Sequence, residues 1–178
     1  MNRLAGIPAP RTIAVGHWPE PGDDVAAGPP SLPGFVASSF SPLAAVAADR
    51  CLKPPYSEGA VSEDAVGERT AIVLVTGSGD RVSADHVRLA VADGKRVGPL
   101  YFFQSVPNSV AGYIAARWGL RGPVVCLSPT TEAHVAGLDQ AALLIADGDA
   151  DQVLVVLVEQ AADGDLAEAM LVSGGDPL

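Results

Sequence analysis

Thr70-Ala-Ile-Val-Leu-Val-Thr76 is an uninterrupted apolar run that ends at Gly77-Ser-Gly79. A run without polar alternation predicts a strand that is buried on both faces, as in the parallel sheets of α/β proteins. Gln152-Val-Leu-Val-Val-Leu-Val-Glu159 has the same pattern and predicts a second buried strand. Residues 124–128 form a shorter apolar segment and predict a third.

Segments with the pattern of helices separate these strands. Ser83 is a suitable N-cap for the first of them. Parallel strands must be joined by crossovers about as long as these helical segments, and such crossovers are right-handed. We therefore predict an α/β fold with a mostly parallel sheet and packed helices. The helices are expected at residues 83–92, 109–118 and 131–146, each closely followed by a glycine.

The N-terminal part of the chain differs from this core. Ten of the fifteen prolines precede residue 56, and proline is excluded from helix interiors and central strands. We expect an irregular surface leader with one short strand at 12–16 and one helix at 42–51. Residues 53–69 are predicted to be a second exposed loop. The leader, residues 1–69, is assigned to the same domain as the core formed by residues 70–178.

Charge excludes several kinds of partner. The chain has 11 basic and 21 acidic residues, and ten of the acidic residues follow Arg121, the last basic one. An acidic surface repels phosphate backbones and anionic lipids, so we expect no nucleic-acid or membrane binding. The longest apolar run, residues 153–158, is too short to cross a membrane. The N-terminus lacks the pattern of a signal peptide.

The two cysteines, Cys51 and Cys126, lie far apart and have no metal-ligand spacing. Reduced thiols are the simpler interpretation, and we expect a cytoplasmic protein without a disulfide, metal or cofactor.

Three short motifs follow one another before Glu159. They are Gln104-Ser-Val-Pro-Asn-Ser-Val-Ala-Gly112, Trp118-Gly-Leu-Arg-Gly-Pro123 and Gly148-Asp-Ala-Asp151. Their order and spacing resemble the β-ketoacyl synthases of fatty-acid and polyketide pathways, in which an Asn-rich helix, a GLRGP turn and a GDAD turn flank the nucleophile. The resemblance implies the N-terminal half of a thiolase-like fold.

The resemblance also locates the family's nucleophilic cysteine. Counting forward from Gly122-Pro123 or back from Gly148-Asp149 leads to Thr131 both times. In the family, the N-terminus of a helix stabilises the thiolate there and forms an oxyanion hole. A hydroxyl needs a base to become a nucleophile, and Glu132 beside it disfavours an oxyanion. We expect Thr131 to be the helix N-cap; a covalent role is the alternative.

The family's other catalytic groups, two histidines and a lysine, come from the second half of the fold. The strand residue Cys126 is expected to be a buried thiol, and His134 an ordinary surface or core histidine. The chain's other histidines and its lysines fall in no matching motif: His17, His86, Lys53 and Lys95.

The resemblance further implies a dimer, in which the strand at 124–128 pairs with its counterpart across a two-fold axis. An apolar edge left unpaired favours aggregation. The alternative is that the chain's own leader covers this edge. The suspected interface residues are Asn108, Val124, Val125, Cys126 and Leu127.

Three functions remain open. The leading hypothesis is a non-catalytic ketosynthase-like subunit in fatty-acid or polyketide biosynthesis, paired as a chain-length factor is with a full-length ketosynthase. Acyl carrier protein is a possible further partner, although the acidic final third would repel it and only residues 81–121 would attract it. The alternatives are an acyltransferase or malonyl decarboxylase that acts through Thr131, and an independent homodimeric binding protein.

Overall fold

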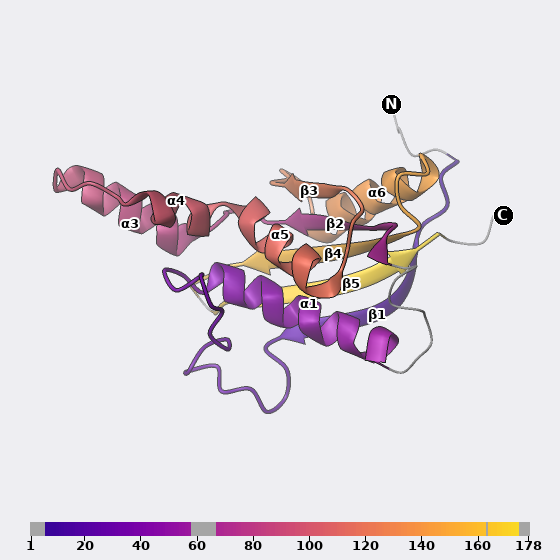
Figure 1. Ribbon diagram of the computed structural model, residues 1–178, viewed down its shortest axis with the longest axis horizontal. Helices are drawn as coiled ribbons and strands as arrows, with labels where there is room; N and C mark the ends of the chain where they lie inside the picture. Colours follow the sequence, from indigo (N-terminus) through magenta and orange to yellow (C-terminus); the bar gives the residue numbers. More distant parts are fainter. Residues whose placement is uncertain (1–5, 58–66, 163, 175–178) are drawn as a thin grey trace.

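The computed structural model describes residues 6–57, 67–162 and 164–174. Its centre is a five-stranded sheet with the order β1-β5-β4-β2-β3 (Figure 1). The predicted α/β class is confirmed. The strands are β1 (Arg11–Trp18), β2 (Thr70–Val75), β3 (Val124–Leu127), β4 (Gln152–Glu159) and β5 (Leu166–Ser173). The helices are α1 (Phe40–Ser57), α3 (Arg81–Ala92), α4 (Pro99–Ser105), α5 (Pro107–Trp118) and α6 (Ala133–Ala146).

Strand direction divides the sheet into two parts. β2, β3 and β4 run parallel to one another, whereas β5 is antiparallel to β4 and β1 is antiparallel to β5. The sequence patterns do not predict β5. It follows β4 after a connection at 160–165, which is too short for the crossover that a parallel pair needs. The sheet is therefore mixed.

Helices cover both faces of the sheet. α1 and α5 pack on one face and α6 packs on the other (Figure 1). Successive side chains of β2 point to opposite faces, so Ile72 and Leu74 join the first core whereas Val73 and Val75 join the second. Both faces are thus covered at the centre of the sheet. This explains why the uninterrupted run of β2 is buried throughout, as predicted.

Two predicted N-caps are wrong. Asp80 rather than Ser83 caps α3, because the Asp80 carboxylate accepts the Ser83 backbone N–H at 2.9 Å. Glu132 rather than Thr131 occupies the N-cap position of α6, and its side chain makes no capping hydrogen bond. Thr131 lies in a bend just before the helix.

The N-terminal segment is built into the same sheet. β1 forms the edge beyond β5. It packs so closely on α1 that a Cβ at Gly16 would lie 2.4 Å from the Cys51 nitrogen. Residues 53–57 continue α1, so the loop predicted from residue 53 is wrong over this part. Residues 58–66 of that predicted loop lie outside the described residues, and residues 68–69 form a turn directly before β2.

Candidate functional site

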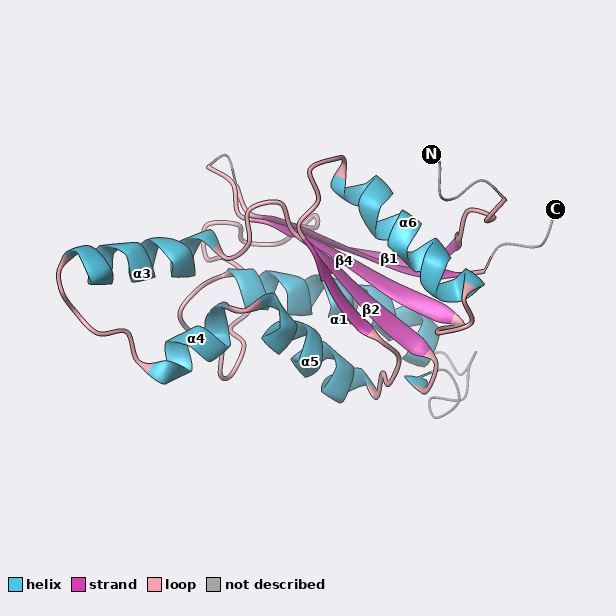
Figure 2. Ribbon diagram, turned by 90° about the horizontal axis from the view of Figure 1, so that it is seen from above, coloured by secondary structure: helices cyan, strands magenta, loops and turns pink. Residues whose placement is uncertain are grey.

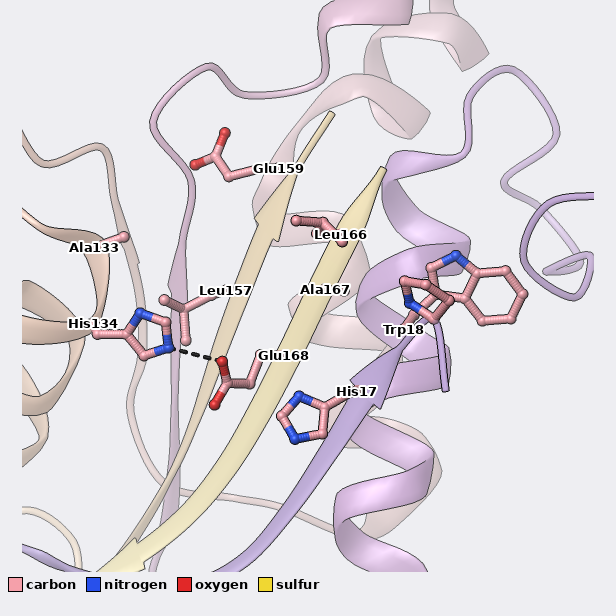
Figure 3. A pocket seen from close by; sticks show the side chains of 10 residues that line it. His17, Trp18, Ala133, His134, Leu157, Glu159, Leu166, Ala167 and Glu168 are labelled. Carbon is pink, nitrogen blue, oxygen red and sulfur yellow. Dashed lines mark hydrogen bonds and ion pairs between the residues drawn. The ribbon is translucent and has the colours of Figure 1, made fainter. Parts of the chain in front are cut away.

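A cavity of about 540 Å³ lies beside the first turn of α6, near the carboxyl end of β4 (Figure 3). Ligand sites of open α/β sheets are commonly found at this end of the parallel strands. Its walls are mainly apolar, with Ala133, Leu157 and Leu166 among them. Its position follows from the topology, because β1, β4, β5 and α6 all contribute to the lining.

Three ionisable side chains stand together on one wall. His134 Nε2 lies 2.7 Å from Glu168 Oε2, and His17 is directly opposite Glu168 in the register of β1 and β5. Figure 3 shows the two imidazoles on either side of the carboxylate. Glu168 is only 26% exposed and His134 is 56% exposed. The pair could exchange a proton with a molecule in the cavity. Sequence reasoning missed this cluster, because it depends on β5 and on the pairing of β5 with β1.

Glu159 ends β4 and connects it to the turn after β2. Its carboxylate accepts the Gly77 N–H and the Ser78 hydroxyl, the latter at 3.1 Å. A Cβ at Gly77 would lie 3.2 Å from a Glu159 oxygen, so the absence of a side chain permits the contact. Glu159 therefore fixes the ends of two parallel strands at the rim of the cavity.

Thr131 is exposed and stands before α6, whereas α6 itself places Ala133 and His134 in the cavity wall. Among the described residues, no base is hydrogen-bonded to the Thr131 hydroxyl. The histidine nearest in sequence, His134, is bonded to Glu168.

The suspected interface residues lie together at the other side of the sheet. β3 is an edge strand, and within the described chain it pairs with β2 alone. Val124 is 42% exposed. The described part of the leader, residues 6–57, does not pair with this edge, because its strand β1 forms the opposite edge and β3 pairs with β2. That alternative is therefore wrong for the described residues.

Cys126 is exposed, which contradicts the predicted buried thiol. It lies on the edge strand β3, and its S–H donates to Asn108 Oδ1 of α5 at 2.9 Å. Partial burial of the sulfur raises the pKa of the Cys126 thiol above its ordinary value. The structure thus joins Asn108 and Cys126, which the sequence places far apart.

Over residues 6–57, 67–162 and 164–174, no group of three or more His, Cys, Asp or Glu side chains could hold a metal ion. Across the same ranges, every helix is too short or too polar to span a bilayer.

The family described as "Beta-ketoacyl synthase, N-terminal domain" matches residues 60–169. The chain belongs to this family. Two curated ketosynthase relatives are 3-oxoacyl-[acyl-carrier-protein] synthases 2. The one from Vibrio harveyi is 29% identical over 96 residues, and the one from Vibrio cholerae is 27% identical over 96 residues. Each match covers 53% of this chain but only 23% of the relative.

Solved ketosynthase structures share the fold. The complex of ketosynthase ApeO with its chain length factor ApeC from Xenorhabdus doucetiae contains a chain with a TM-score of 0.67 and 19% identity; the match covers 94% of this chain and 80% of that one. A β-ketoacyl synthase from Burkholderia phymatum has a TM-score of 0.66 and 16% identity; the match covers 97% of this chain and 54% of that one. The ishigamide ketosynthase/chain length factor has a TM-score of 0.66 and 22% identity; the match covers 89% of this chain and 49% of that one. The thiolase-like ketosynthase fold inferred from the motifs is confirmed.

Proposed function

We propose that this ketosynthase-like chain is a non-catalytic subunit that pairs with an active, cysteine-bearing ketosynthase in fatty-acid or polyketide biosynthesis, as a chain-length factor does. The observation that carries the proposal is the start of α6, where Thr131 and Glu132 stand at the position that we assign to the family's nucleophile. The remaining support comes from the free edge of β3.

The start of α6 is poorly suited to acyl transfer. A threonine hydroxyl becomes a nucleophile only when a positioned base removes its proton. Among the described residues, the His134 ring contacts Glu168, and no hydrogen bond joins it to the Thr131 hydroxyl. Glu132 is the N-cap residue of α6, and a negative side chain at this helix end disfavours a developing oxyanion, which the helix N–H groups would otherwise stabilise. The start of α6 therefore meets neither requirement of the reaction, an activated nucleophile and a stabilised oxyanion.

The edge of β3 favours a partner. It presents the apolar Val124, and within the described residues its outer side has no strand partner; natural proteins rarely leave such an edge uncovered. This chain covers 80% of the matched chain in the ApeO–ApeC complex, so the two are of comparable length. That complex joins a ketosynthase to its chain length factor. This likeness supports a ketosynthase as the partner.

Affinity purification from the native cell tests the pairing. The tagged full chain is expected to retain a full-length ketosynthase with an intact nucleophilic cysteine, identified by mass spectrometry. Co-expression of the two chains should then yield a one-to-one complex in size-exclusion chromatography with light scattering. A stable homodimer that binds no ketosynthase would instead favour an independent binding protein.

A separate assay tests the missing activity. The purified chain is incubated with radiolabelled acyl or malonyl carrier protein, beside the Thr131→Ala variant. We expect no acyl-enzyme and no released CO₂ from either protein. Acyl-enzyme that forms on the wild type and is lost in Thr131→Ala would establish the acyltransferase alternative, and released CO₂ that is lost in Thr131→Ala would establish the decarboxylase alternative.

A further inference from the structure

The cavity beside α6 lies where helices leave one face of the sheet open. Among the described helices that pack on the sheet, α6 alone lies on this face, whereas α1 and α5 lie on the other (Figure 2). α6 packs mainly on β2 and β4, so the neighbouring strands β5 and β1 are open beside it. The volume of about 540 Å³ lies within the range of small-molecule sites, roughly 300–1,000 Å³.

The apolar walls of the cavity are held in place. Figure 3 shows Ala133 on one side of the cavity and Trp18 on the other. Trp18 is only 5% exposed, and the Arg50 guanidinium lies 5.3 Å from the centre of its ring. Arg50 is itself fixed by two hydrogen bonds to Asp23, at 2.6 and 2.7 Å. A ligand therefore meets a preformed wall and spends little free energy on ordering it.

Glu168 stands in the middle of a row of side chains that crosses three strands. It lies directly opposite Leu157 of β4 and directly opposite His17 of β1. Residues that are directly opposite on neighbouring strands share one face of the sheet. The carboxylate is therefore flanked by an apolar side chain and an imidazole. From α6, His134 Nε2 approaches Glu168 Oε2 at 2.7 Å.

This cluster has hydrogen-bonding capacity that the described residues do not use. The second carboxylate oxygen, Glu168 Oε1, and the ring of His17 have no hydrogen-bond partner within residues 6–57, 67–162 and 164–174. A carboxylate oxygen accepts hydrogen bonds, and a neutral imidazole has one nitrogen that accepts. An ammonium group carries three N–H donors on one atom. It could thus bond to both acceptors at once.

The charges around the cavity favour a cation. The described residues that line it include two carboxylates, Glu168 and Glu159, and neither Lys nor Arg. Arg50, which stacks on the cavity's tryptophan, is already paired with Asp23 at 2.6 Å and with Glu20 at 3.6 Å. A partly buried carboxylate attracts a cation more strongly than one in water does. A ligand carboxylate or phosphate would be repelled.

We propose that this cavity binds a small organic amine in its protonated form, with the ammonium group on Glu168 and His17. The ammonium donates to Glu168 Oε1 and to a ring nitrogen of His17, and the apolar body of the amine lies against the leucine and tryptophan side chains of the walls. β3 contributes nothing to the lining, so the inference does not rest on the subunit pairing proposed above.

A heteronuclear NMR titration of the full chain tests the site and its preference for a cation. The probe is 2-phenylethylamine; 3-phenylpropanoate and 2-phenylethanol present the same phenylethyl group with a negative and a neutral end. We expect the amine to bind about tenfold or more tightly than either analogue. The shifted amides should cluster at residues 17–18, 133–134, 157 and 166–168.

Three outcomes of this titration would overturn the proposal. They are an analogue that binds as tightly as the amine, shifts that cluster elsewhere in the chain, and no binding of the amine at about 10 mM. None of them depends on a variant, and none bears on whether the chain pairs with a ketosynthase.

Glu168→Gln removes the charge and keeps the size of the side chain. It should weaken amine binding about tenfold or more, because the ammonium loses its ionised acceptor. Asp139→Asn is the matched control, since it removes an exposed carboxylate of α6 that does not line the cavity. It should leave Kd within about twofold. Circular dichroism checks that both variants fold, and unchanged amine binding by folded Glu168→Gln would contradict the assigned contact.

Lowering the pH should release the amine. Histidine gains its positive charge between about pH 8 and pH 5, and protonated His17 and His134 would repel the ammonium and compete with it for Glu168. Glu159 of β4 is the other titratable group of the lining. The Kd of 2-phenylethylamine should rise about fivefold or more between about pH 8 and pH 5.5. Tighter or unchanged binding at the lower pH would show that the imidazoles do not face the bound cation.

Discussion

At the position that we assign to the family's nucleophile, Thr131 stands beside Glu132, the N-cap residue of α6. A cysteine at this position would have to ionise, and a carboxylate beside it raises the pKa of a thiol rather than lowering it. The single substitution Thr131→Cys leaves this carboxylate in place.

Thr131→Cys should therefore not restore condensation. The expected result is no β-ketoacyl product from acyl and malonyl carrier proteins, measured by mass spectrometry of the carrier-bound thioesters. Thr131→Cys combined with Glu132→Ala is the informative companion, because it also removes the opposing charge. Product formed by Thr131→Cys alone would contradict our account of this position.

The two thiols should react very differently. Burial raises the pKa of Cys51 to about 12, and partial burial raises that of Cys126. Since the thiolate is the reactive form, alkylation of native Cys126 should accelerate as pH rises, with its midpoint above that of an ordinary thiol. Cys51 is 0% exposed and should react only on unfolding. Mass spectrometry of iodoacetamide-treated protein measures both.

Cys126→Ser is the control for this experiment, and it should leave no rapidly labelled thiol. Fast labelling of Cys51 in the native chain would show that α1 opens readily. If the chain pairs with a ketosynthase through β3, as we propose, Cys126 should be protected from alkylation in that complex.

At the scale of elements, α6 depends on its small residues. A Cβ at Gly137 would lie 2.7 Å from Val155 Cγ1 and 3.2 Å from Val75 Cγ2, both on the central strands. The helix can approach β2 and β4 closely only because this position has no side chain. The geometry of the adjacent cavity depends on that approach.

Gly137→Ala should lower the free energy of unfolding by about 1–3 kcal/mol, because overpacking exceeds the gain in helix propensity. Gly112→Ala in α5 is the matched control, since a Cβ there meets nothing within 4 Å. It should raise stability by about 0.5–1 kcal/mol through helix propensity alone. Urea denaturation measures both, and effects of the same sign would contradict the close packing of α6.

At the scale of the whole molecule, stability is distributed unevenly. β2 is buried along its whole length at the centre of the sheet, whereas α3 is exposed except at Ser83 and Ala90. A domain arranged in this way opens locally where few apolar contacts hold a segment.

In the free chain, native-state hydrogen exchange should be slow in the buried strands and fast in the exposed helices. Amides of β2 and β4 should exchange slowest, close to the rate set by global unfolding, and amides of α3 fastest among the helices. Mass spectrometry of peptides after timed deuteration gives the comparison. Amides of α3 that are as well protected as those of β2 in the free chain would contradict this order.

The sequence by itself determined the class of the fold and its family. The runs of β2 and β4 predicted buried strands because nothing polar interrupts them, and three motifs with fixed spacing indicated the ketosynthase resemblance. Gly119 ends α5 as predicted, since its φ of +64° is a conformation that favours glycine.

Tertiary structure alone decided the direction of β5, the exposure of Cys126 and the grouping of His17, His134 and Glu168. Each of these depends on which segments lie beside one another, and no local pattern contains that information. Cys126 has the same apolar neighbours as a buried strand residue, yet it is exposed because β3 is an edge. Local patterns report what a segment can form, whereas exposure and proximity depend on what is packed against it.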